Sequence, residues 1–75
     1  MSKSIYSKEY KYLFQKLKQA RIEIGLDQTD VARKLKTTQS YISKIEHGQV
    51  KIDIFLLKDF SKIYKKPLEY FLPKK

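Results

Sequence analysis

The chain of 75 residues contains no cysteine and no tryptophan, and it has one histidine. Without cysteine the protein has no disulfide, no thiolate nucleophile and no thiolate zinc site. The histidine, His47, stands beside a glycine, where it would cap a helix or simply be exposed. No serine or carboxylate pattern supplies it with a nucleophile or an orienting group. The sequence therefore predicts a protein that is not an enzyme and that holds no metal and no cofactor.

Long apolar runs are absent as well. The longest, residues 54–57, has four residues, far short of the ~20 that span a membrane. The N-terminal stretch MSKSIYSKEYKYLF lacks the apolar segment of a signal peptide. No internal repeat, low-complexity segment or linker divides the chain. These absences predict one cytoplasmic domain over residues 1–75, with a core over residues 8–72.

What the chain has in excess is positive charge, with 17 basic residues against 8 acidic ones and a net charge of +9. Residues 1–21 carry six basic and one acidic side chain, residues 49–75 carry seven and three, and residues 22–48 carry four of each. Such a charge favours an anionic partner: nucleic acid first, a membrane surface or an acidic protein second. This distribution is typical of a neutral segment that recognises bases, flanked by two basic surfaces that contact the phosphate backbone. The other interpretation is that lysine is simply the common surface residue of this protein and has no role in binding.

Apolar residues recur at helical spacing along most of the chain. The first predicted helix covers residues 8–24, begins after an N-cap at Ser7 and ends at Gly25. The second begins after Asp27, which forms a capping box with Asp30, and it ends near residue 35. The buried positions of these two helices are Leu13, Phe14, Leu17, Ala20, Ile24, Val31, Ala32 and Leu35.

Three further helices are predicted after the connection 36–38. The third is capped by Thr38 and ends at Gly48, the fourth covers residues 54–64 after a cap at Asp53, and Pro67 lies in the first turn of a short fifth. The predicted buried positions are Ile42 and Ile45 in the third helix and Ile54, Leu57, Phe60 and Tyr64 in the fourth. The fifth helix carries Leu68, Phe71 and Leu72. The sequence thus predicts an all-α fold, a compact bundle of five short helices.

The second and third helices, joined by a three-residue turn within residues 28–47, have the layout of a helix-turn-helix DNA reader. The first turn of the third helix presents Gln39, Ser40, Tyr41 and Lys44 outward. Glutamine matches the N6 and N7 of adenine, and lysine suits guanine or a phosphate. These side chains would otherwise be an ordinary solvated face, and half-buried packing on the second helix is the alternative for Tyr41.

Three segments carry a resemblance to a known family: LKQARIEIGLDQTDVARKL, TTQSYISKIEHG and IDIFLLKDFSKIYKKPLEYFL. From about residue 17 to residue 72 the chain resembles the phage-repressor helix-turn-helix domain, the lambda-repressor-like Xre or Cro/C1 type. The resemblance implies base contacts by Gln39, Ser40 and Lys44, with Tyr41 over the sugar-phosphate backbone or a thymine methyl. It also implies phosphate contacts by Gln28, Thr38, Gln49 and Lys51. Arg21 and Glu46 occupy positions that form a partly buried ion pair in such proteins.

The chain departs from this family at Lys36 and Lys65, where glycine is common. If Lys36 adopts the left-handed conformation, it is strained by about 1 kcal/mol. Its ammonium group would also add a phosphate contact close to the DNA.

Apolar residues in excess of the buried set predict a homodimer interface made by Phe55, Leu56, Ile63 and Tyr70. The alternative is that part of this surface packs under the N-terminal segment. A dimer would hold two recognition helices about 34 Å apart on a palindromic operator. The sequence thus predicts a small transcriptional regulator, a repressor, that binds double-stranded DNA. The alternatives are an antitoxin-type module whose last two helices bind a toxin and, less favoured, association with a membrane surface.

Overall fold

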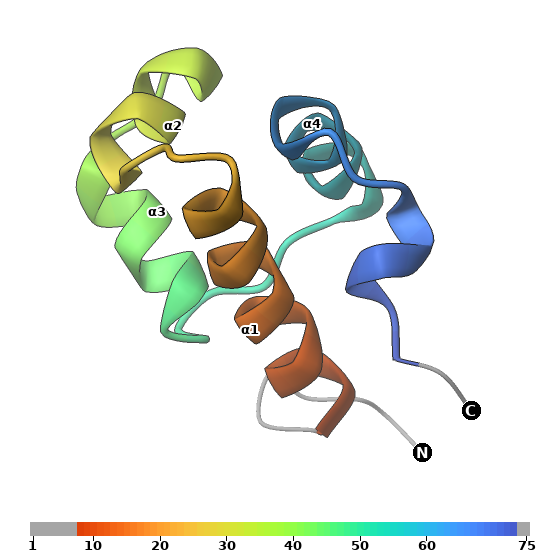
Figure 1. Ribbon diagram of the computed structural model, residues 1–75. Helices are drawn as coiled ribbons and strands as arrows, with labels where there is room; N and C mark the ends of the chain where they lie inside the picture. The colour runs from red at the N-terminus through yellow and green to blue at the C-terminus, as the bar shows by residue number, and fades with distance from the viewer. Residues whose placement is uncertain (1–7, 74–75) are drawn as a thin grey trace.

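The computed structural model describes residues 8–73 and shows a purely helical arrangement over that range. Four α-helices follow one another: α1 (Lys8–Glu23), α2 (Gln28–Leu35), α3 (Gln39–Glu46) and α4 (Ile54–Tyr64). A short 3₁₀ helix, η1 (Leu68–Phe71), comes last. In Figure 1, α1 runs through the middle of the molecule, with α2 and α3 on one side and α4 and η1 on the other. None of these helices is long and apolar enough to cross a membrane.

The all-helical fold is confirmed, but the prediction of five α-helices is wrong, because the fifth element is a single 3₁₀ turn. Pro67 precedes this turn as its N-cap, in extended conformation, instead of lying inside its first turn. At the other end, Leu72 is also extended, with φ −102° and ψ 137°. A residue before proline is pushed away from the helical region, and Pro73 follows Leu72. Too few residues remain between the two prolines for an α-helix.

The predicted helix starts are confirmed at three of the four α-helices. Asp27 and Asp30 form a reciprocal capping box, in which the Asp30 N–H donates to Asp27 Oδ1 over 2.7 Å and the Asp27 N–H donates to Asp30 Oδ2 over 3.0 Å. Thr38 Oγ1 accepts the N–H of Tyr41, and Asp53 Oδ1 accepts that of Leu56. Such caps satisfy backbone donors that a helix start leaves open. The predicted cap of α1, Ser7, lies outside the described residues.

The core lies where α1 crosses the other helices, and among the described residues it is made of aliphatic and aromatic side chains alone. Its members are Leu13, Phe14, Leu17, Ala20, Val31, Ala32, Ile42, Ile45, Leu57, Phe60, Tyr64 and Phe71. Each of these except Phe71 was predicted to be buried. Ile24 and Leu35, which were also predicted to be buried, are half-buried against the cluster, as is Leu68.

Two apolar residues at helical spacing in the last two helices, Ile54 and Leu72, are exposed, and Ile54 was predicted to face inward. Ile54 is 53% exposed, because it is the first residue of α4 and lies beyond the edge of the cluster that Leu57 and Phe60 join. Leu72 is 47% exposed, because the extended backbone before Pro73 carries it away from η1. Both residues line a surface hollow that helical spacing alone could not reveal.

Candidate nucleic-acid interface

The turn between α2 and α3 closes α2 through a left-handed residue. Lys36 has φ 58° and ψ 45°, and its N–H points back to the carbonyls of Ala32 and Arg33. The N–H of Thr37 donates to Ala32 O over 2.9 Å. This pattern is usual when glycine ends a helix, so Lys36 takes a conformation that costs a side chain about 1 kcal/mol. The strain predicted for this lysine follows from the observed dihedral angles.

One face of α3 presents polar side chains to solvent while the other face is buried. Gln39, Ser40 and Lys44 are exposed, whereas Ile42 and Ile45 are fully buried in the core. Tyr41 is half-buried and packs against that core. The exposed side chains therefore stand on a helix whose orientation is fixed by packing.

A chain of hydrogen bonds connects the interior to the first turn of α3. Arg21 binds both carboxylate oxygens of Glu46, with Nε 2.7 Å from Oε2 and Nη2 3.0 Å from Oε1. Gln28 Nε2 donates to Glu46 Oε1 over 3.0 Å, and Gln39 Nε2 donates to Gln28 Oε1 over 2.6 Å. We call Arg21, Glu46, Gln28 and Gln39 the polar relay. It joins three helices, because its members come from the end of α1, the end of α3 and the starts of α2 and α3.

The ion pair at the inner end of the relay is well shielded. The side chains of Arg21 and Glu46 are only 11% and 3% exposed. The hydrogen bond to Glu46 raises the pKa of Arg21 above its ordinary value. Arg21 Nη1 also donates to the carbonyl of Leu26, over 3.0 Å, in the loop before α2. The pair predicted from the sequence is thus present, and it also fixes the loop that leads into the helix-turn-helix.

The links of Gln28 to Glu46 and Gln39 were not predicted. The sequence holds one signal for them: both glutamines occupy the first position of a helix, immediately after the N-cap, in helices that a three-residue turn brings together. One hydrogen of the Gln39 amide is used within the protein, which leaves one N–H and the carbonyl oxygen. Adenine presents the matching acceptor N7 and donor N6 in the major groove.

The remaining predicted phosphate contacts flank the two ends of α3. Lys36 and Thr38 precede the helix, Gln49 and Lys51 follow it, and all four are exposed. Gln28 is half-buried. Together with Lys44 in the last turn of α3, these two lysines place three exposed cations along and beyond the ends of the helix.

The acidic residues of the same region are held by partners within the protein. The N–H of Asp27 lowers the pKa of Asp30, and Lys66, with Gln19, lowers the pKa of Glu23. Glu46 lies inside the relay. Residues 22–48 have no net charge, but their carboxylates are paired within the protein while the lysines around α3 are exposed. The exposed surface around α3 is therefore more positive than the charge count suggests.

The end of α3 involves the histidine. His47 Nδ1 lies 2.7 Å from the carbonyl oxygen of Ser43 and 3.3 Å from its hydroxyl, and the side chain is exposed. Gly48 follows with φ 72°, and a Cβ there would lie 3.0 Å from the Phe14 ring. Over residues 8–73 no group of three histidine or carboxylate side chains is placed to hold a metal.

The four residues predicted to form a dimer interface differ in exposure. Phe55 is 71% exposed. Leu56, Ile63 and Tyr70 are half-buried, because each packs in part against the core. Tyr70 is further held by the ammonium groups of Lys16 and Lys66, 4.9 and 4.7 Å from its ring centroid. The side chain most available to a partner is therefore at the start of α4.

This architecture is that of a helix-turn-helix protein. The helix-turn-helix family profile matches residues 17–71, so the chain belongs to that family, of the phage-repressor (Xre, Cro/C1) type. A search of curated proteins finds no match.

Solved structures show the same fold. The DNA-binding domain of BldD is similar with a TM-score of 0.79 and 25% sequence identity, over 97% of this chain and 100% of that one. Two crystal structures of iron(II) HppE, one with its substrate and one with the alternative substrate (S)-1-HPP, give TM-scores of 0.80 and 0.81 at 16% identity. This chain covers 88% and 89% of its own length in those comparisons but spans only 35% of the HppE chain. The HppE similarity shows the fold alone.

Proposed function

We propose that the protein is a small transcriptional regulator that binds a specific double-stranded DNA sequence with α3 in the major groove. The polar relay is the observation that carries this proposal, because it orients Gln39 and leaves its amide a donor and an acceptor for adenine. Family membership and the likeness to the BldD DNA-binding domain support the same function. They point to a regulator and away from an enzyme.

In this proposal the residues on and around α3 divide into two groups. Gln39, Ser40 and Lys44 contact base edges, and Tyr41 lies over the backbone or a thymine methyl. The backbone group contacts phosphates and so sets the register of the protein on the duplex without reading sequence. That group consists of Gln28, Lys36, Thr38, Gln49 and Lys51. The N–H groups at the start of α2 support Gln28 at its phosphate.

We further propose that the protein acts as a homodimer and represses transcription from a palindromic operator. A two-fold axis would place the two copies of α3 about 34 Å apart, one turn of DNA. Affinity should fall steeply with salt, because each neutralised phosphate releases condensed counterions.

Selection of bound DNA from a random pool tests this function. With the wild-type protein a motif should emerge, and Gln39→Ala should change the base pair recovered at one position of each half-site, a loss of about 1–3 kcal/mol of discrimination. Gln28→Ala should weaken binding to every sequence and also loosen the preference at the Gln39 position, because it removes the partner of that amide.

Gln15→Ala is the matched control, since Gln15 is an exposed glutamine on α1. It should leave both the affinity and the recovered motif unchanged. Failure of any motif to emerge at low salt would show that sequence-specific binding is wrong.

A further inference from the structure

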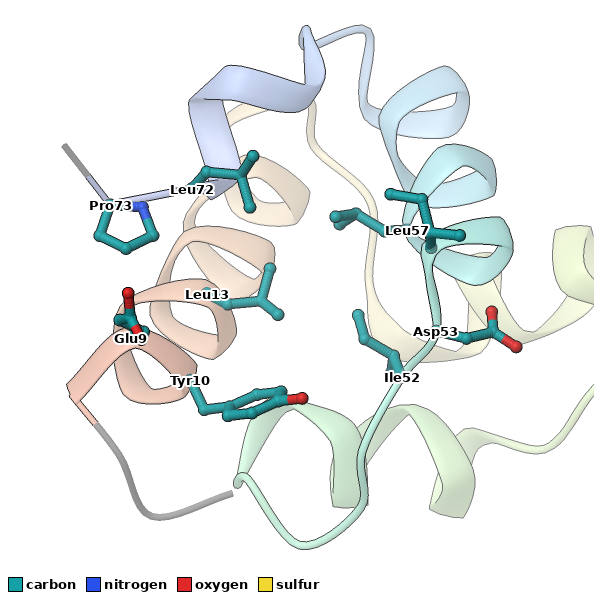
Figure 2. A pocket seen from close by; sticks show the side chains of 9 residues that line it. Glu9, Tyr10, Leu13, Ile52, Asp53, Leu57, Leu72 and Pro73 are labelled. Atoms are coloured by element: carbon teal, nitrogen blue, oxygen red, sulfur yellow. The ribbon is translucent and has the colours of Figure 1, made fainter. Parts of the chain in front are cut away.

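An apolar hollow of about 320 Å³ lies between the start of α1, the loop before α4 and the C-terminal segment. Figure 2 shows Tyr10, Leu13 and Leu72 on one side of this space and Ile52 and Leu57 on the other. Leu72 is 47% exposed. Removing such apolar surface from water is favourable, so a segment that covers the hollow stabilises the protein.

One side of the hollow is the loop between α3 and α4, which carries Lys51, a residue assigned to a phosphate in the proposed function. Among the described residues, the backbone of residues 50–52 makes no hydrogen bond to other backbone groups. Val50 and Ile52 are half-buried against the core, and Lys51 between them is exposed. Apolar contacts therefore hold this loop, and the filling of the hollow beside Ile52 determines how firmly Lys51 is placed.

We propose that the chain's own N-terminal segment fills this hollow with Ile5 and Tyr6, and so fixes the loop that carries Lys51. The sequence before α1 is MSKSIYS, in which Ile5 and Tyr6 are two adjacent large apolar residues. Tyr10, the third residue of α1, lines the hollow, so the segment leaves the helix at the edge of this space. Ile5 stands three residues before α1, which gives it a reach of about 10 Å.

Two observations favour this segment over a second copy of the chain. Side chains on a helix lean toward its N-terminus, so Tyr10 and Leu13 lean toward the residues that precede α1. A short tether also gives the segment an effective concentration on the order of millimolar. A second copy, in contrast, would bring another net charge of +9 against the first.

Nuclear magnetic resonance of the full chain tests the docking. Overhauser cross-peaks should connect the Ile5 methyl groups with those of Leu57 and Leu72. Ile5→Asn should remove these contacts and lower the backbone order parameters of residues 50–52 from the ~0.85 of a rigid backbone to below about 0.6. Ser4→Asn is the matched control, because it changes the same segment without removing an apolar side chain, and it should alter neither.

The absence of these cross-peaks in the wild-type chain would overturn the proposal. A mixture of isotopically labelled and unlabelled chains identifies the occupant. If the cross-peaks appear there between the two kinds of chain, then a second copy fills the hollow and the proposal is wrong.

DNA binding tests the role of the loop, and this part of the inference rests on the proposed function. For a pool of random duplexes, Ile5→Asn should reduce the magnitude of the slope of log affinity against log salt by about one, as Lys51→Ala does. The double variant should match Lys51→Ala alone, because both changes act through one ammonium group. Additive effects, or an unchanged slope in Ile5→Asn, would show that the segment does not position Lys51.

The two experiments separate this inference from the proposed function. If the Overhauser cross-peaks are present and no DNA is bound, the function fails and the docking of Ile5 stands. If DNA is bound with a sequence preference and the cross-peaks are absent, the docking fails and the function stands. The motif recovered with Ile5→Asn should equal that of the wild type, because phosphate contacts do not read sequence.

Discussion

Where α1 meets α2 and α3, four polar side chains form one hydrogen-bonded relay, whereas on the side of α4 and η1 two buried phenol oxygens have no hydrogen-bond partner among the described residues. The first region fixes an exposed amide through a shielded ion pair. The second relies on apolar packing and leaves apolar side chains at the surface. The comparison indicates that directional bonds are concentrated at the first turn of α3, whereas the side of α4 and η1 is held by apolar packing.

The largest expected effect comes from breaking the relay at its inner end. Glu46→Ala leaves the Arg21 guanidinium shielded and without its carboxylate, which should cost about 3 kcal/mol of unfolding free energy. Glu23→Ala is the control, since it removes an exposed carboxylate from Lys66, with side chains 44% and 31% exposed, and should change little. Urea denaturation measures both. Equal effects of the two substitutions would show that the relay adds nothing beyond a surface pair.

The opposite change is expected on the α4 side. Tyr64 is fully buried and its hydroxyl has no partner, and burial raises the pKa of this phenol. Tyr64→Phe keeps the ring stacked on Phe60 and removes an unsatisfied polar atom. We expect a gain of about 1 kcal/mol in unfolding free energy by urea denaturation. A loss of stability would reveal a buried water bound to the phenol.

The two left-handed lysines allow the same substitution to be made in each region. Lys36 has φ 58° and Lys65 has φ 57°, and each ends a helix. Replacing either by glycine relieves the strained dihedral, and we expect about 0.5–1 kcal/mol of stabilisation from each in thermal melts. Only Lys36→Gly should also weaken DNA binding, because that lysine lies beside α3. A matching loss of affinity in Lys65→Gly would remove the distinction between the two regions.

The same contrast explains how far the sequence predicts the molecule. Caps such as Asp27 and Thr38 act within three residues, so local pattern locates them, and buried stripes follow from helical period. The exposure of Ile54 and Leu72 was not predicted, because it depends on where neighbouring elements end. The bonds of Gln28 depend on two side chains distant in the chain, which no local period encodes. Both the surface hollow and the polar relay depend on tertiary geometry, which the sequence alone did not predict.

Two carboxyl groups with lowered pKa values make the stability of the protein depend on pH. The pKa of Asp30 lies below its ordinary 3.8, chiefly because the N–H of Asp27 donates to it, and the pKa of Glu23 lies below 4.5, chiefly because of Lys66. A carboxyl whose pKa is lowered by folding stabilises the native state above its unfolded pKa, and that contribution is lost as pH falls through the folded value. Stability should therefore fall below about pH 4.5, and Asp30→Asn or Glu23→Gln should each flatten part of that fall.

Salt distinguishes the two carboxylates. The Glu23 contribution comes from an exposed ion pair that joins α1 to the segment after α4, so high salt should screen it and make the wild type resemble Glu23→Gln. The Asp30 contribution comes from a backbone hydrogen bond within the capping box and should persist at high salt. Acid titrations of the unfolding free energy at low and high salt measure both. If salt abolishes both contributions alike, the capping box at the start of α2 stabilises the protein through charge alone. The directional hydrogen bonding of the α1–α2–α3 region would then be confined to the polar relay.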